Sequence, residues 1–251
     1  MLIKRLTPTH TYLQYGDDHA HDAAGKALRM ANNDRTRIAM QATCNVAAEL
    51  DSVFASRPDV AVLHDVRIRT EDGKLHIDHL FITHNFHVFI VESRTAGQTL
   101  GISDQKQFTL TDPLGSAYAI PSPLRQLMRN RALLKRLLRQ LDLPKRFGRT
   151  LQPSFHHYLL IDPQAEVQNQ SDIDFRLFVS PSQLIALIDQ QAGSRSLFGF
   201  LQRMPSQQLR QTSRRIAQIH APKGVRFSSK FRHVAAAEQP VPRSVLGNTP
   251  R

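Results

Sequence analysis

Two acidic residues, Asp78 and Glu92, stand inside apolar runs whose β-branched residues are typical of buried strands. A carboxylate in such a run is costly to bury unless a cation or hydrogen bonds compensate for its lost hydration. Strand alternation places Glu92 and Arg94 on one face, and pairing through the short turn between the strands brings Asp78 near Glu92. Two carboxylates beside a cationic side chain are the groups that phosphodiester hydrolysis with Mg²⁺ or Mn²⁺ requires. The alternative is a plain ion pair of Arg94 with Asp78 or Glu92 and no metal.

These residues belong to a segment that predicts three strands joined by short turns, at 60–68, 75–82 and 87–93. The second and third strands are apolar on both faces, which is typical of strands inside a covered sheet. An amphipathic helix is expected before them, over about 34–54. The elements expected after them are a strand near 108–110, a leucine-rich helix at 124–141, strands at 155–161 and 175–179, a helix at 182–191 and a basic helix near 209–219.

This order of elements predicts an α/β protein with a mixed sheet flanked by helices, in which an antiparallel three-strand meander carries the two acids. The chain is long enough for one sizeable core. We expect four regions along it: an N-terminal arm with a short helix at 1–33, the core at 34–192, a basic helical extension at 193–220, and a basic tail without fixed structure at 221–251.

The positive charge of the chain is unevenly distributed. Residues 1–120 hold 12 Lys and Arg against 14 Asp and Glu, whereas residues 121–251 hold 21 against 7. Such a basic half favours a nucleic acid partner, DNA in our interpretation, because each neutralised phosphate releases condensed counterions. The alternatives are an ordinary solvated surface and an anionic membrane surface as the partner. The candidate DNA-binding residues lie on the helix at 124–141 and are Arg125, Arg129, Lys135, Arg136 and Arg139.

Other classes of protein and site fit the sequence poorly. A single cysteine, Cys44, excludes an intrachain disulfide and a cysteine-based zinc site, and suits the reducing cytoplasm, which is the expected location. No run approaches the roughly 18 apolar residues of a spanning helix, so membrane insertion is not expected, and the preferred interpretation includes no membrane partner. His76, His79, His84 and His87 fall within twelve residues, but their spacing matches no familiar zinc pattern.

Four stretches resemble, in order and spacing, the nuclease-related domain family, called NERD. They are 62–66, 77–80, 88–94, and Pro123 with Gln126 ahead of a leucine-rich helix. The resemblance covers roughly residues 35–140. It implies a restriction-endonuclease-like fold with a D…(D/E)-x-K motif, a Mg²⁺-dependent nuclease core, and Asp78 and Glu92 as metal ligands.

The sequence departs from the family pattern at two positions. Members usually carry Gly-Glu at the start of the first helix, but here only Asp34 or Glu49 could supply that carboxylate, and each is more simply a helix cap or a solvated residue. Arg94 replaces the motif lysine. Arginine stays protonated, so it donates charge and hydrogen bonds but cannot act as a general base.

The sequence therefore predicts a Mg²⁺- or Mn²⁺-dependent DNA nuclease whose catalytic residues are Asp78, Glu92 and Arg94. A non-catalytic nucleic acid-binding relative with a degenerate site is one alternative. The other is a protein-interaction module whose basic surface binds an acidic partner.

Overall fold

The computed structural model describes residues 1–5, 38, 41–70, 73–94, 99–111, 115–141, 143–193 and 203–219. The chain divides into two units, Met1–Ala221 and Pro222–Arg251. All described residues belong to the first unit. Most of the expected N-terminal arm and the whole of the expected tail therefore lie outside the described residues.

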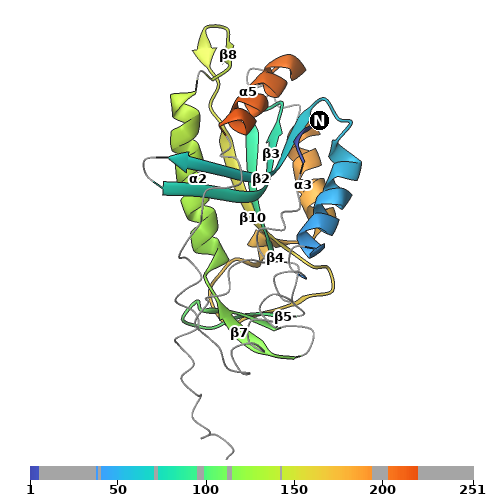
Figure 1. The fold of residues 1–251 in the computed structure, drawn as a ribbon, viewed down its shortest axis with the longest axis vertical. Coiled ribbons are helices and arrows are strands. Elements are labelled where there is room, and N and C mark those ends of the chain that lie inside the picture. Colours follow the sequence, from blue (N-terminus) through green and yellow to red (C-terminus); the bar gives the residue numbers. More distant parts are fainter. Residues whose placement is uncertain are drawn as a thin grey trace, which may run out of the picture. The chain divides into compact units, whose positions relative to one another are not determined.

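A six-stranded mixed sheet occupies the middle of the first unit, with strand order β1-β2-β3-β4-β10-β12 (Figure 1). β2, β3 and β4 pair antiparallel in chain order, whereas the β1–β2, β4–β10 and β10–β12 pairs are parallel. The strands of this sheet are β1 (Leu2–Lys4), β2 (Val60–Thr70), β3 (Gly73–Thr83), β4 (His87–Arg94), β10 (Ser154–Ile161) and β12 (Phe178–Val179).

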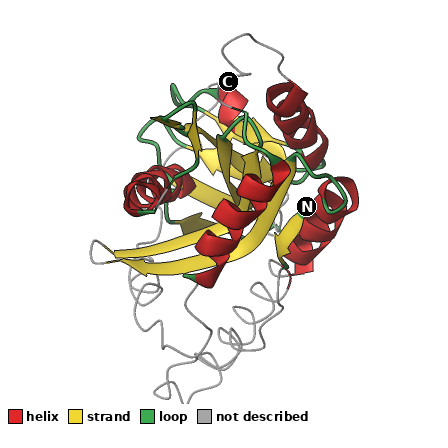
Figure 2. Cartoon of the chain, turned by 90° about the horizontal axis from the view of Figure 1, so that it is seen from above, coloured by secondary structure: helices red, strands yellow, loops and turns green. Residues whose placement is uncertain are grey.

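Helices cover both faces of this sheet, and the view from above shows strands lying between them (Figure 2). On one face lie α2 (Pro123–Gln140) and α5 (Ser206–Gln218), whose leucines and isoleucines share a core cluster with the strands. On the other face lie a helix over residues 41–54 and α3 (Pro181–Gly193). The prediction of a mixed α/β fold with a helix-flanked sheet is thus confirmed. Among the described residues, no helix is long and apolar enough to cross a membrane.

The position of α2 follows from its first residues. Pro123 suits the first helical turn because its ring fixes φ near the helical value and its missing N–H would have had no partner there. Ser122 precedes it as the cap, with its hydroxyl accepting a hydrogen bond from the Arg125 backbone N–H at 3.4 Å. The buried stripe of the helix, which includes Leu127, Leu134 and Leu138, then faces the sheet.

Strict alternation of side chains breaks at the same level in β2 and β3. Leu63 and Val66 both pack in the core cluster on the α2 side although they are three residues apart, and Ile77 and Leu80 do the same. Asp65 has φ +50°, the left-handed region that L-residues rarely adopt. The alternation is therefore interrupted at the polar residues that lie between these pairs. The interruption decides to which face of the sheet those polar side chains point.

A second sheet and a small hairpin complete the unit. Four strands of four residues each pair in the order β11-β5-β6-β7. They are β5 (Thr99–Ile102), β6 (Phe108–Thr111), β7 (Ala117–Ile120) and β11 (Glu166–Asn169). The hairpin consists of β8 (Lys145–Arg146) and β9 (Arg149–Thr150).

Two sequence expectations need correction here. Only one of the strands of the second sheet, near 108–110, was expected. The strand expected at 175–179 is only partly present, because Phe175–Leu177 forms a 3-10 turn capped by the Asp174 carboxylate before Phe178–Val179 pairs with β10.

Candidate active site

Glu92 is a carboxylate with no exposed surface in the middle of the first unit. It lies on β4, and two of its hydrogen-bond partners come from α2. Gln126 Nε2 donates to Glu92 Oε2 at 2.6 Å, and Asn130 Nδ2 donates to Glu92 Oε1 at 2.7 Å. Burial, followed by the negative charge of nearby Asp78, raises the pKa of Glu92 well above its usual range. The site thus holds an acid whose ionisation is opposed by its surroundings.

Asp78 approaches Glu92 where β3 and β4 separate. Their ladder runs only from the Ile82–Val88 pair to the His79–Val91 pair, so the backbone beyond it needs other partners. The Ser93 N–H donates to Asp78 Oδ2 at 2.8 Å. On β3 the freed backbone of His76 is held by the Asn130 side chain, which accepts from its N–H at 3.4 Å and donates to its carbonyl. Hydrogen bonds to side chains thereby replace the backbone hydrogen bonds that β3 and β4 no longer make with each other.

Arg94 completes the group from the end of β4. Its Nη1 donates to the Ser93 carbonyl at 2.6 Å and lies 3.9 Å from Asp78 Oδ2, and its Nη2 donates to Gln126 Oε1 at 3.3 Å. Gln126 therefore touches Arg94 with its oxygen and Glu92 with its nitrogen. The structure brings the three predicted residues Asp78, Glu92 and Arg94 together, with Gln126 between the last two.

Asp65 is a third acid at this level, on β2 opposite Asp78. His76 Nε2 lies 3.1 Å from Asp65 Oδ1 and 3.8 Å from Asp78 Oδ1, and so links the two carboxylates. Burial opposes ionisation of Asp65, but hydrogen bonds and charge from His76 and Arg67 outweigh it and hold the pKa of Asp65 below its usual range. Its Oδ2 is buried without a hydrogen-bond partner. This acid is therefore held as a carboxylate.

A chain of hydrogen bonds crosses the sheet behind Asp78. His64 Nε2 lies 3.1 Å from Asp51 Oδ1 on the helix at 41–54, His64 Nδ1 lies 2.7 Å from His79 Nδ1, and His79 Nε2 lies 2.8 Å from Ser93 Oγ. His64 and His79 have no exposed surface, and burial lowers the pKa of His79 to about 3.

The carboxylate of Asp51 sets the direction of this chain. Because a carboxylate only accepts, His64 carries its proton on Nε2 when both rings are neutral, and its Nδ1 accepts from His79 Nδ1. His79 Nε2 then accepts from the Ser93 hydroxyl. The Ser93 N–H binds Asp78. This chain of hydrogen bonds therefore fixes Ser93, the residue that positions Asp78 in the site.

The five basic residues predicted to bind DNA all lie on α2 and are exposed. They stand on the face turned away from the buried leucine stripe of that helix. Arg129 packs against the β2–β3 hairpin, where a Cβ added at Gly73 would lie 2.8 Å from its Nη2. A hollow of about 350 Å³ lies near this hairpin, and Arg69 and Arg136 are among the residues that line it.

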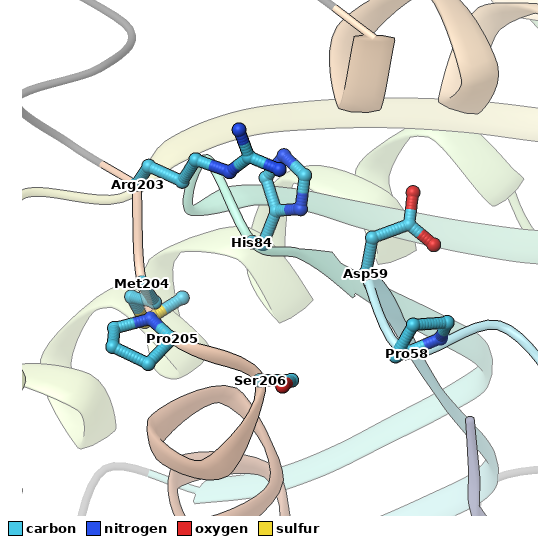
Figure 3. Close-up of a pocket in the computed structure, with 7 residues that line it drawn as sticks. All are labelled: Pro58, Asp59, His84, Arg203, Met204, Pro205 and Ser206. Atoms are coloured by element: carbon cyan, nitrogen blue, oxygen red, sulfur yellow. The ribbon is translucent and has the colours of Figure 1, made fainter.

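Another hollow, of about 230 Å³, lies away from the acids (Figure 3). Arg203 and His84 stand at its rim, and burial lowers the pKa of His84. The Asp59 carboxylate that also lines it is engaged by Arg57 at 2.7 Å. None of the acids near Glu92 lines this hollow, so it is separate from the site described above.

Residues 39–162 match the model of the family described as nuclease-related domain, NERD. The chain contains a nuclease-related domain. No curated protein and no solved structure matched the chain.

The nuclease-related domain runs from the helix at 41–54 to the end of β10. It includes Asp78, Glu92 and Arg94, all of α2, and the chain of hydrogen bonds from Asp51 to Ser93. α3 and α5 follow it in sequence and pack on its sheet. The hydrogen-bond partners of Glu92 among the described residues therefore come from the matched segment.

The donor set suits a hard cation with few protein ligands. Within the described ranges, no three His, Cys, Asp or Glu side chains converge as a ready-made cation site. Mg²⁺ does not need such a cage, since it commonly keeps several waters and binds through one or two carboxylates plus phosphate oxygens. The paired acids Asp78 and Glu92, whose negative charges repel each other when both are ionised, fit that pattern.

The other sequence candidates are placed as follows. Asp34 lies outside the described residues. Glu49 is exposed on the helix at 41–54, and it is Asp51 of that helix that reaches the polar network. The four clustered histidines have separate partners: His76 contacts Asp65, His79 contacts His64 and Ser93, His84 lines the hollow of Figure 3, and His87 contacts His156.

Proposed function

We propose that this chain is a metal-dependent nuclease that hydrolyses DNA phosphodiester bonds, with a restriction-endonuclease-like core. One observation carries the proposal. Within a nuclease-related domain, the fully buried Glu92 lies beside Asp78 and Arg94 at the point where two central strands separate. Burying an acid beside a second acid is unfavourable in a purely structural role, and a divalent cation removes the repulsion.

Asp78 and Glu92 would hold Mg²⁺ or Mn²⁺ through their carboxylates, with Asn130 and Gln126 fixing the orientation of Glu92. When bound, such an ion polarises a phosphoryl oxygen and lowers the pKa of a coordinated water. Ser93 keeps Asp78 in place through its backbone N–H. The protein thus supplies two pre-oriented carboxylates and leaves the remaining coordination positions to water and phosphate.

In this proposal Arg94 stabilises negative charge and does not transfer protons. Its guanidinium is held by the Ser93 carbonyl and Gln126 Oε1, and it cannot accept a proton. From that position it stabilises negative charge that develops on the phosphate during hydrolysis. The exposed basic residues of α2, from Arg125 to Arg139, would bind the phosphate backbone on either side.

The direct test is incubation of pure protein with plasmid and with single-stranded DNA in Mg²⁺, Mn²⁺ or EDTA. We expect cleavage that requires the cation. Asp78→Asn and Glu92→Gln should each abolish cleavage and leave DNA binding nearly intact, and Glu49→Gln, at an exposed glutamate, is the matched control. Calorimetric titration with Mn²⁺ should give a binding heat for wild type that both site variants lose. Equal weak heats for all proteins would refute the metal site.

A non-catalytic DNA-binding relative is the second candidate function. It is favoured by Arg94 at the position of the motif lysine, since arginine cannot act as a general base. That candidate predicts DNA binding without cleavage in any of these buffers. In that case Arg94→Lys is the variant expected to recover cleavage, because it restores a compact ammonium beside Asp78 and Glu92.

A further inference from the structure

The β8–β9 hairpin places one aromatic ring in solvent. Phe147 is 73% exposed, more than any of the other large apolar residues that the structure describes as exposed. It stands at the tip of a two-residue turn between Arg146 and Arg149, which pair across the hairpin. In Figure 1 the hairpin, labelled β8, projects beyond the end of α2. Nothing in the core of the domain requires a phenylalanine at this tip.

The backbone at the tip is unfavourable for phenylalanine. Phe147 has φ +49° and Gly148 has φ +74°, so both central residues have the positive φ of a type I′ turn. Asn-Gly and Gly-Gly are the preferred pairs for such turns, because residues with a bulky side chain are strained in the left-handed region. A strained and exposed aromatic residue indicates a role other than folding.

The ring is surrounded by positive charge. Lys145, Arg146 and Arg149 are its neighbours in the hairpin, and no acidic residue occurs between residues 143 and 161. The Arg146 guanidinium carbon lies 5.2 Å from the centroid of the Phe147 ring. Arg146 Nη1 also donates to the Arg203 carbonyl, just ahead of α5, and so fixes the base of the hairpin to the domain.

We propose that this hairpin is a base-stacking tip, in which Phe147 stacks on an unpaired base of single-stranded DNA while the flanking cations contact its phosphates. The proposal rests on the proposed DNA-directed function and names the form of DNA that this surface selects. An aromatic ring among cations is the usual device for binding single strands, since every base offers a flat face. A protein partner would instead need a contiguous apolar patch, and Phe147 is the one large apolar residue that the structure describes as exposed in this hairpin.

The chain contains no tryptophan, which gives a direct probe. In Phe147→Trp the introduced indole is the only one, and stacking on a base should quench its fluorescence. We expect strong quenching with a single-stranded oligonucleotide of about 12 nucleotides and little with a blunt duplex of the same sequence. Phe175→Trp is the matched control, because Phe175 is 57% exposed on the 3-10 turn between Asp174 and Arg176. Its fluorescence should not respond to either DNA.

A second variant separates binding from folding. Phe147→Asn creates the Asn-Gly pair that a type I′ turn prefers, so its Tm should equal or exceed that of wild type. Its affinity for the single strand should fall about 5- to 150-fold, the range for loss of one stacking contact. The salt dependence of its DNA affinity should stay unchanged, because all the basic side chains of the hairpin remain.

Three outcomes would overturn this inference. Unchanged single-strand affinity in Phe147→Asn would exclude stacking while leaving cation-dependent cleavage, and so the proposed function, intact. Tighter binding of wild type than Phe147→Asn to phosphatidylcholine vesicles containing phosphatidylserine, with equal DNA affinities, would make the tip a membrane contact. Failure of wild type to bind any DNA would refute the stacking tip together with the DNA-directed function.

Discussion

Glu92→Gln should stabilise the metal-free protein at neutral pH and at the same time abolish its response to divalent cations. Glutamine keeps the shape of the side chain and a carbonyl acceptor for one of the two amide donors, Gln126 Nε2 or Asn130 Nδ2, and loses the acceptor of the other. It removes the charge that burial and Asp78 oppose. The usual expectation for a residue in a buried hydrogen-bond network is the reverse, loss of stability, so the sign of the change is informative.

The pH dependence follows from the raised pKa. Glu92 has a pKa near 4.5 in the unfolded chain and a higher one in the folded protein. Between those two values the folded protein binds more protons than the unfolded chain, so the free energy of unfolding falls as pH rises. The contribution of Glu92 is fully present below pH 4.5 and declines by about 1.4 kcal/mol for each pH unit above it, up to the folded pKa. A change of about 1.4 kcal/mol, the effect of one pH unit, corresponds to about 3–6 °C in Tm for a protein of this size.

Thermal unfolding in EDTA between about pH 5 and 8 measures this effect. The Tm of Glu92→Gln should exceed that of wild type by an amount that grows with pH. Adding Mn²⁺ at about 100 times its Kd should then raise the stability of wild type by about 2.7 kcal/mol and leave the variant unchanged. Glu49→Gln, at an exposed position of the helix at 41–54, controls for the loss of one negative charge.

Two results would refute this reasoning. A Tm difference between wild type and Glu92→Gln that stays constant with pH would mean that the Glu92 charge is fully compensated without a cation. Equal stabilisation of both proteins by Mn²⁺ would mean that Glu92 does not bind the ion.

Three further predictions concern other parts of the site. With Mg²⁺ present, Arg94→Ala should lose most cleavage and Arg94→Lys should keep some, whereas an alanine variant as fast as wild type would exclude Arg94 from the mechanism. Replacing Arg129, Arg136 and Arg139 together by alanine should weaken DNA binding and reduce the slope of log affinity against log salt by up to about 2.7; unchanged low-salt affinity would make this an ordinary solvated face. Asp51→Asn should lower the free energy of unfolding by about 1–3 kcal/mol through the weakened bond to buried His64, measured by denaturant unfolding, and equal stability would show that Asp51 does not orient the histidines.

The elements that the sequence predicted well are those with long apolar patterns. β2, β3, β4 and α2 each span eight or more residues, enough to show a period and to be bounded by turns. The second sheet was largely missed because each of its strands has only four residues. β11 pairs with β5 across more than 60 residues of sequence, and no local pattern encodes such a partner.

The residues of the candidate site also divide into those that the sequence pattern reveals and those that it does not. Asp78 and Glu92 were found because acids in apolar strands are conspicuous, and Asp65 on β2 meets the same criterion but was not selected. Asn130 carries no charge and sits among arginines and leucines, so its role in holding Glu92 gives no signal in the sequence. Asp51 reads as a solvated helix residue, and only its contact with His64 reveals its place in the network.

The contacts of Gln126 bear on whether arginine at the third motif position marks a decayed site. Gln126 Oε1 accepts from Arg94 Nη2, which leaves Nε2 as the group that faces Glu92. Guanidinium has several donors in one plane, so Arg94 reaches the Ser93 carbonyl and Gln126 at the same time, which a single ammonium on a shorter side chain does less readily. A decayed site loses the partners of its charged groups without replacement. Here arginine, glutamine and glutamate form one continuous set of hydrogen bonds around the buried carboxylate, and that continuity favours a site adapted to arginine over one that has decayed.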